Sequence, residues 1–121
     1  MYGVLESLPL FEFVGQECSQ IGLGEFQLQF HFSDGSSICV EGKWELWNRD
    51  NVLVDRFTPH TQREKYCVHK IIGQKVCSFS INAPTSFTLH FEDKFALKIY
   101  DDSQHYESFS LHSSSACSTY V

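Results

Sequence analysis

Two stretches of this chain carry the same pattern: LQFHFSDGSSICV at residues 28–40 and FTLHFEDKFALKI at residues 87–99. Each alternates apolar and polar residues, breaks at a short segment that contains an aspartate, and then alternates again. Such a pattern is typical of two antiparallel strands joined by a tight turn. At an offset of 59 residues, His31 falls on His90 and Asp34 on Asp93. The sequence therefore predicts two equivalent β-hairpins.

The register of both hairpins follows from the two-residue period of a strand. A three-residue loop at 33–35, or at 92–94, places the apolar residues of both strands on one face. The expected pairs are Leu28–Val40, Phe30–Ile38 and Phe32–Ser36, then Phe87–Ile99, Leu89–Leu97 and Phe91–Phe95. This loop needs a positive φ, which Gly35 adopts without steric cost. Lys94 stands at that position in the second hairpin, so either Lys94 is strained or the second loop adopts another turn.

A second similarity lies upstream, where VGQ at 14–16 matches IGQ at 72–74. Gly15 and Gly73 each follow a short apolar segment, and glycine is common just past the end of a helix. Thr61 with Glu64 forms a plausible capping box for the second helix. We therefore expect two pseudo-repeated helix–strand–hairpin units, at approximately residues 8–42 and 66–101.

The remaining segments also favour β structure. Residues 43–57, KWELWNRDNVLVDRF, predict a further hairpin, and YESFSLH predicts a last strand. The expected inward positions of this hairpin are Trp44, Leu46, Val52 and Val54. A chain of 121 residues favours a single domain, here residues 1–121. The predicted fold is α+β and mostly β: an antiparallel sheet or half-open barrel of seven to nine strands, with two short helices.

Composition narrows the class of protein. No run approaches 18 apolar residues, which predicts no membrane segment, and the N-terminus lacks the basic start of a signal peptide. A cytoplasmic protein is expected. The five cysteines form no CxxC pair and are expected to be free thiols in a reducing compartment, rather than zinc ligands.

Charge is unevenly distributed along the chain, whose formal net charge is −6. Residues 1–42 hold six acids and no lysine or arginine, residues 43–75 hold seven bases against four acids, and residues 76–121 hold five acids against two bases. Acidic ends argue against nucleic-acid binding, because phosphates would be repelled. They would attract a basic partner, although a solvated surface explains the same counts.

An acidic patch, Asp101, Asp102 and Glu107, is the first candidate site, with His105 and His112 nearby. Its simplest interpretation is a structural cap, in which Asp102 or Ser103 begins a single helical turn. A docking surface for a partner comes second and a catalytic site last, because no catalytic, nucleotide-binding or cofactor-binding motif occurs in the chain. We therefore expect neither enzymatic activity nor a cofactor.

Two further sets of residues are candidates for a metal site and for a binding surface. His31 and His90 share an outward position and could hold a metal, but such histidines are more often polar residues on a solvated face, so no metal is expected. Trp47 and Tyr106 are candidate interface anchors, since aromatic residues are enriched in binding hot spots. Strand parity allows only one of Trp44 and Trp47 to point inward.

The segment FEDKFALKIYDDSQHYESFSL, residues 91–111, resembles the end of a family of small, mostly uncharacterised bacterial proteins. Their pattern reads F-E-D-G, L-x-I-Y-D-D-S, Y-E-S-F, preceded by L-L-G-x-x-V, to which Ile72, Gly73 and Val76 correspond. Lys94 departs from it, because the family has glycine there. The similarity covers about the last 40 residues. Such families resemble immunity proteins that are encoded beside polymorphic or contact-dependent toxins.

The resemblance implies an immunity protein, monomeric or homodimeric, that binds a cognate toxin and occludes its active site. A basic nuclease is the expected toxin, and no nucleic acid or membrane is expected as a partner. The expected contact residues are Asp101, Asp102, Tyr106, Glu107 and Trp47. The alternative is a small-molecule binding or regulatory module of a β-rich fold, using a cavity in the sheet and without catalytic activity.

Overall fold

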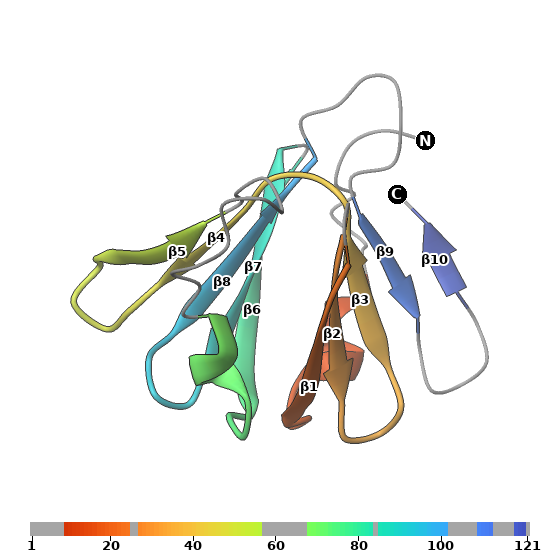
Figure 1. Ribbon diagram of the computed structural model, residues 1–121, viewed down its shortest axis with the longest axis horizontal. Coiled ribbons are helices and arrows are strands. Elements are labelled where there is room, and N and C mark those ends of the chain that lie inside the picture. The colour runs from red at the N-terminus through yellow and green to blue at the C-terminus, as the bar shows by residue number, and fades with distance from the viewer. Residues whose placement is uncertain are drawn as a thin grey trace.

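A computed structural model describes residues 9–24, 27–56, 68–83, 85–101, 109–112 and 118–120 of the chain. These residues form ten strands in two antiparallel sheets of five. The first sheet has the order β1-β2-β3-β9-β10, and the second β5-β4-β8-β7-β6. Figure 1 shows the sheets leaning toward each other, with β5 and β10 at the two outer sides.

The strands of the first sheet are β1 (Cys18–Leu23), β2 (Leu28–Phe32), β3 (Ser37–Val40), β9 (Phe109–His112) and β10 (Ser118–Tyr120). Those of the second are β4 (Trp44–Trp47), β5 (Leu53–Arg56), β6 (Val76–Asn82), β7 (Ser86–Phe91) and β8 (Ala96–Tyr100). The mostly β, antiparallel character that the sequence predicts is confirmed. The sheets do not close into a barrel.

The strands β1-β2-β3 and β6-β7-β8 are consecutive three-stranded meanders, one in each sheet. The strand that follows each meander crosses to the other sheet, so that β4 pairs with β8 and β9 pairs with β3. The two crossings match in register, because Trp44 lies opposite Ile99 and Phe109 opposite Val40. The sheets are thus tied together by an exchange of strands.

The two predicted helices are wrong for the described residues. Only 3-10 turns stand there, η1 (Leu10–Phe13) and η3 (Val68–Ile71), so the predicted helix–strand repeat is not supported. The physical reason lies just beyond each turn, where the N–H of Gly15 donates to the Val76 carbonyl and the N–H of Gly73 to the Cys18 carbonyl. Pairing with a distant segment ends each turn after four residues. The Thr61–Glu64 capping box lies outside the described residues, and the described part contains no helix that could cross a membrane.

Both hairpins have the predicted register. Phe30 lies opposite Ile38, and Leu89 lies opposite Leu97. The loops also match, because the N–H of Gly35 donates to the Phe32 carbonyl and that of Lys94 to the Phe91 carbonyl, each at 3.0 Å. Gly35 has φ +90° and Lys94 φ +68°. The choice that the sequence left open is settled: Lys94 adopts the left-handed conformation of the same turn.

The hairpin of β4 and β5 is confirmed with one error. Trp44 and Leu46 are buried, and Val54 packs against the core, but Val52 is 53% exposed. The Asn48 side chain accepts hydrogen bonds from the N–H of Asp50 (2.9 Å) and of Val52 (3.1 Å). These bonds hold Val52 in the loop, so the inward alternation begins later than predicted.

One hydrophobic core fills the space between the sheets. Its members from the first sheet are Cys18, Leu28, Phe30, Phe32, Ile38, Val40, Phe109 and Leu111, and those from the second are Trp44, Leu46, Val76, Phe87, Leu89, Phe91, Leu97 and Ile99. Phe87 contacts Phe109 edge to face across the sheets, with ring centroids 4.9 Å apart. Burying each such large side chain contributes about 1.5–3 kcal/mol, so the exchange of strands is stabilised by apolar burial.

The two meanders also pair directly where β1 and β6 begin. Residues 15–18 and 73–76, which we call the clasp, run antiparallel with Glu17 opposite Lys75. Its four backbone hydrogen bonds are Gly15 N–H to Val76 O (2.7 Å), Val76 N–H to Gln16 O (3.0 Å), Cys18 N–H to Gln74 O (3.0 Å) and Gly73 N–H to Cys18 O (2.8 Å). Gly15 and Gly73 have φ +87° and +90°, which favours glycine at both positions.

The two hairpin loops should respond oppositely to substitution. Lys94→Gly is expected to raise the free energy of unfolding by about 1 kcal/mol, because glycine adopts a positive φ without steric cost. Gly35→Lys is expected to lower it by about 1 kcal/mol through backbone strain alone, since a Cβ at Gly35 meets no atom within 4 Å. Urea unfolding of both variants measures this. A glycine at 94 that destabilises, or a lysine at 35 that costs nothing, would contradict the shared turn.

Candidate functional site

The predicted acidic patch is described only at Asp101. Its side chain is buried, with 7% of the residue exposed, and its N–H donates to the Thr85 carbonyl at 2.9 Å. Such a position leaves little surface for a partner. Asp102, Tyr106 and Glu107 lie outside the described residues. The role of this patch as a contact surface stays a prediction.

Trp47 is the predicted contact residue that the structure places best. Trp44 is buried, whereas Trp47 lies partly exposed on the outer face of β4, so only one of the two points inward. The Trp47 Nε1–H donates to Glu45 Oε1 at 3.3 Å. The Tyr100 hydroxyl of β8 donates to the same carboxylate oxygen at 2.8 Å. One carboxylate thus holds two aromatic side chains on the outer face of the second sheet.

Cations lie beside Tyr100 and Glu45. Lys43 Nζ lies 4.4 Å from the centroid of the Tyr100 ring, and Lys98 Nζ lies 5.0 Å from it. Arg56 and Lys98 are the cross-strand neighbours of Glu45 on its two sides. Burial raises the pKa of the Tyr100 phenol, Glu45 raises it further, and Lys43 opposes the rise. We call Lys43, Glu45, Trp47, Arg56, Lys98 and Tyr100 the aromatic face; its three cations outnumber its one carboxylate.

A row of cross-strand neighbours leads from Trp47 to a hollow. Trp47 lies opposite Ala96, and Ala96 lies opposite His90. Beside His90, strand β6 carries a bulge, because Cys77 is an extra residue between Val76, the partner of Phe91, and Ser78, the partner of His90. A bulge adds a residue to one strand and re-aims its side chains. It opens space beside His90.

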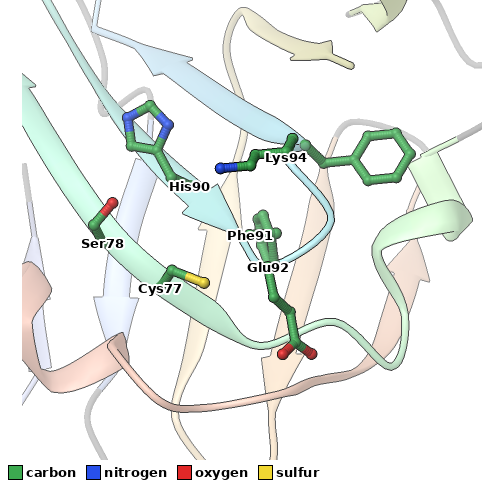
Figure 2. A pocket seen from close by; sticks show the side chains of 7 residues that line it. Cys77, Ser78, His90, Phe91, Glu92 and Lys94 are labelled. Atoms are coloured by element: carbon green, nitrogen blue, oxygen red, sulfur yellow. The ribbon is translucent and has the colours of Figure 1, made fainter. Parts of the chain in front are cut away.

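The hollow has a volume of about 320 Å³. Its lining residues are Cys77, Ser78, His90, Phe91, Glu92, Lys94 and Phe95. Figure 2 shows the Lys94 side chain extending toward His90, while the Glu92 carboxylate points away from both. Glu92 Oε1 accepts a hydrogen bond from the Lys75 N–H of the clasp at 3.1 Å, and His90 Nε2 lies 3.4 Å from Ser80 Oγ.

The first meander has the same backbone but different side chains. Strand β1 also carries a bulge, opposite His31, at Ser19 and Gln20. The residue at the loop position of Lys94 is Gly35, and the one at the position of Glu92 is Ser33. The charged side chains Glu92 and Lys94 that line the hollow therefore have no charged counterparts in the first meander. Sequence reasoning missed this site; its one visible signal was the lysine at a glycine position.

The described cysteines are free thiols in three different environments: Cys18 is buried, Cys39 is partly buried and Cys77 is exposed. Burial raises the pKa of the Cys18 thiol to about 12. Burial also raises the pKa of the Cys39 thiol, as does the charge of Glu41. In the part of the chain that the structure describes, no three metal-ligating side chains come together.

Comparison with known protein families, with curated proteins and with solved structures gave no match for this chain.

The three thiols should react very differently. Iodoacetamide at mildly alkaline pH is expected to modify Cys77 readily and to leave Cys18 unmodified, because alkylation needs an accessible thiolate. Peptide mass spectrometry after timed quenching measures this. Denaturant should make Cys18 as reactive as Cys77. Rapid modification of Cys18 in the native protein would contradict its burial.

Stability should fall at high pH because of Cys18. Its thiol ionises near pH 9 when unfolded but near pH 12 when folded. The stabilisation is complete below pH 9 and is lost as pH rises from about 9 to about 12, at up to about 1.4 kcal/mol per pH unit. Urea unfolding of Cys18→Ala and wild type across this range tests it. The stability advantage of the wild type should shrink with pH; a constant difference would contradict the shift.

Proposed function

We propose that this chain is a protein-binding module that docks through the aromatic face of its second sheet. The observation that carries the proposal is the Trp47–Glu45–Tyr100 arrangement, in which one carboxylate oxygen accepts from both Trp47 Nε1 (3.3 Å) and the Tyr100 hydroxyl (2.8 Å). Tryptophan, tyrosine and arginine are the residues most enriched in binding hot spots, and the aromatic face has all three.

The surroundings favour binding over a purely structural role. The buried side of β4, with Trp44 and Leu46, already supplies the packing that holds the strand in the sheet. Trp47 and Tyr100 add hydrogen bonds that restrict their rotation on the outer side. Side chains that are ordered before binding lose less entropy when a partner arrives. The aromatic face is thus suited to act as a preorganised anchor.

The specific form that we propose is an immunity protein, which covers the active site of a cognate toxin domain. The resemblance of residues 91–111 supports this form. The charge of the aromatic face, with Lys43, Arg56 and Lys98 around Glu45, favours a partner whose contacting patch is acidic. A basic nuclease would instead suit residues 9–41, whose described charged residues are all acids: Glu12, Glu17, Asp34 and Glu41.

Affinity measurements against the product of the neighbouring gene test the proposal. Trp47→Ala is expected to weaken binding by about 2 kcal/mol, roughly thirtyfold, because a central anchor is removed. The charge reversal Lys43→Glu/Lys98→Glu is expected to weaken it as well, and mainly at low salt. The matched control is Asp34→Lys/Glu41→Lys, which reverses two exposed charges of the first sheet and should leave affinity within about twofold.

Two results would overturn the proposal. Loss of binding in the Asp34/Glu41 variant, with Trp47→Ala unchanged, would move the contact to the acidic sheet and favour a basic toxin. If the product of the neighbouring gene does not bind, the proposal that this chain is an immunity protein is wrong. Far-ultraviolet circular dichroism of each variant separates loss of contact from loss of fold.

A further inference from the structure

We propose that the hollow between β6 and the β7–β8 loop binds a small organic anion, held by Lys94 and His90, independently of docking at the aromatic face. Nothing in the proposed protein-binding function requires this site. Its volume of about 320 Å³ lies at the lower end of the range of small-molecule pockets. A single aromatic or aliphatic acid is the size of ligand that it would accept.

The backbone at Lys94 is the first argument. Lys94 has φ +68°, a conformation that side-chain-bearing residues rarely adopt, where the first hairpin has Gly35 at φ +90°. The two loops share the same backbone hydrogen bond, so glycine would serve the fold better at this position. Residues in unfavourable backbone conformations cluster at ligand-binding sites. A role for the Lys94 side chain in ligand binding would explain why a lysine stands at this strained position.

The charges of the hollow are the second argument. Among the described residues no carboxylate lies within ion-pair distance of Lys94. The adjacent Asp93 faces Arg49, with 3.9 Å between Oδ1 and Nη2, and Glu92 accepts from the clasp backbone. Both neighbouring acids are thus directed elsewhere, while Lys94 extends toward His90 over the hollow (Figure 2). An incoming carboxylate or phosphate would meet a cation that forms no ion pair with the part of the chain that the structure describes.

The other lining residues supply a hydrogen-bond donor and an apolar surface. The bulge in β6 brings Ser78 beside His90, and its hydroxyl can donate a hydrogen bond to an anion. Phe95 is partly exposed and offers apolar surface to the body of the ligand, whereas Phe91, which also lines the hollow, is almost entirely buried in the core. The lining is thus mixed, with polar side chains that can orient an anion and one aromatic ring that can contact its body.

The test uses benzoate as the probe and benzamide as its neutral counterpart of nearly the same shape. Calorimetry and amide chemical shifts of the full chain are followed during titration. Benzoate is expected to bind in the millimolar range, to shift the amides of residues 77–78 and 90–95, and to bind at least about tenfold more tightly than benzamide. Phenyl phosphate in a third titration shows whether phosphate esters are preferred to carboxylates, and either preference fits the proposal.

Three variants separate binding from folding. Lys94→Gly keeps the turn and removes the ammonium, so it should lose benzoate binding by about tenfold or more while becoming more stable. His90→Gln should weaken binding severalfold. Lys98→Met, which removes a cation of the aromatic face, should leave benzoate affinity unchanged.

Any of three outcomes would overturn the proposal: no saturable benzoate binding in the millimolar range, equal affinity for benzoate and benzamide, or full binding by Lys94→Gly. Because Trp47→Ala is expected to bind benzoate normally, failure of this site and failure of the protein-docking face are distinguishable.

Discussion

The architecture of this protein depends on the clasp, in which residues 15–18 pair with residues 73–76 through four backbone hydrogen bonds. These bonds end both 3-10 turns, set the direction in which β1 and β6 leave, and join one sheet to the other. The hairpin loops attach to the same place, because the N–H of Ser33 donates to the Glu17 carbonyl (2.9 Å) and that of Glu92 to the Lys75 carbonyl (3.0 Å). The clasp therefore fixes both hairpin loops, including the β7–β8 loop that lines the hollow.

The exchange of strands joins the two sheets at further positions besides the clasp. Strand β4 leaves the first meander to pair with β8, and β9 leaves the second to pair with β3. Each exchanged strand brings an aromatic residue, Trp44 or Phe109, into the shared core. Separating the sheets would break the clasp, two strand pairings and the core together. One cooperative unit is the expected consequence, since none of these interactions can be lost alone.

Local rules explain which parts of this fold can be predicted from the sequence. Strand parity gives the pairs Phe30–Ile38 and Leu89–Leu97, because alternation and loop length are both visible in the hairpin itself. The same rules predict helices before Gly15 and Gly73, and for the described residues they fail because the competing partner lies more than fifty residues away. The exchange of β4 and β9, and the bulge that opens the hollow, are equally non-local. The aromatic face can be predicted only in part. Strand parity predicts that Trp47 and Trp44 point to opposite faces. Parity does not predict the pairing of β4 with β8, which brings Tyr100 to Glu45.

The two hairpins differ at one position, Gly35 in the first and Lys94 in the second, where the needs of the fold do not explain the residue. Both loops satisfy the same hydrogen bonds at nearly the same φ, yet one uses glycine and the other lysine. A sequence that served folding alone would have glycine in both, since the backbone requirement is identical. Places where a local rule is broken without a structural gain are where functional constraints are expected. Lys94 is such a place, because its backbone conformation is explained by the turn whereas its side chain is explained only by what it faces across the hollow.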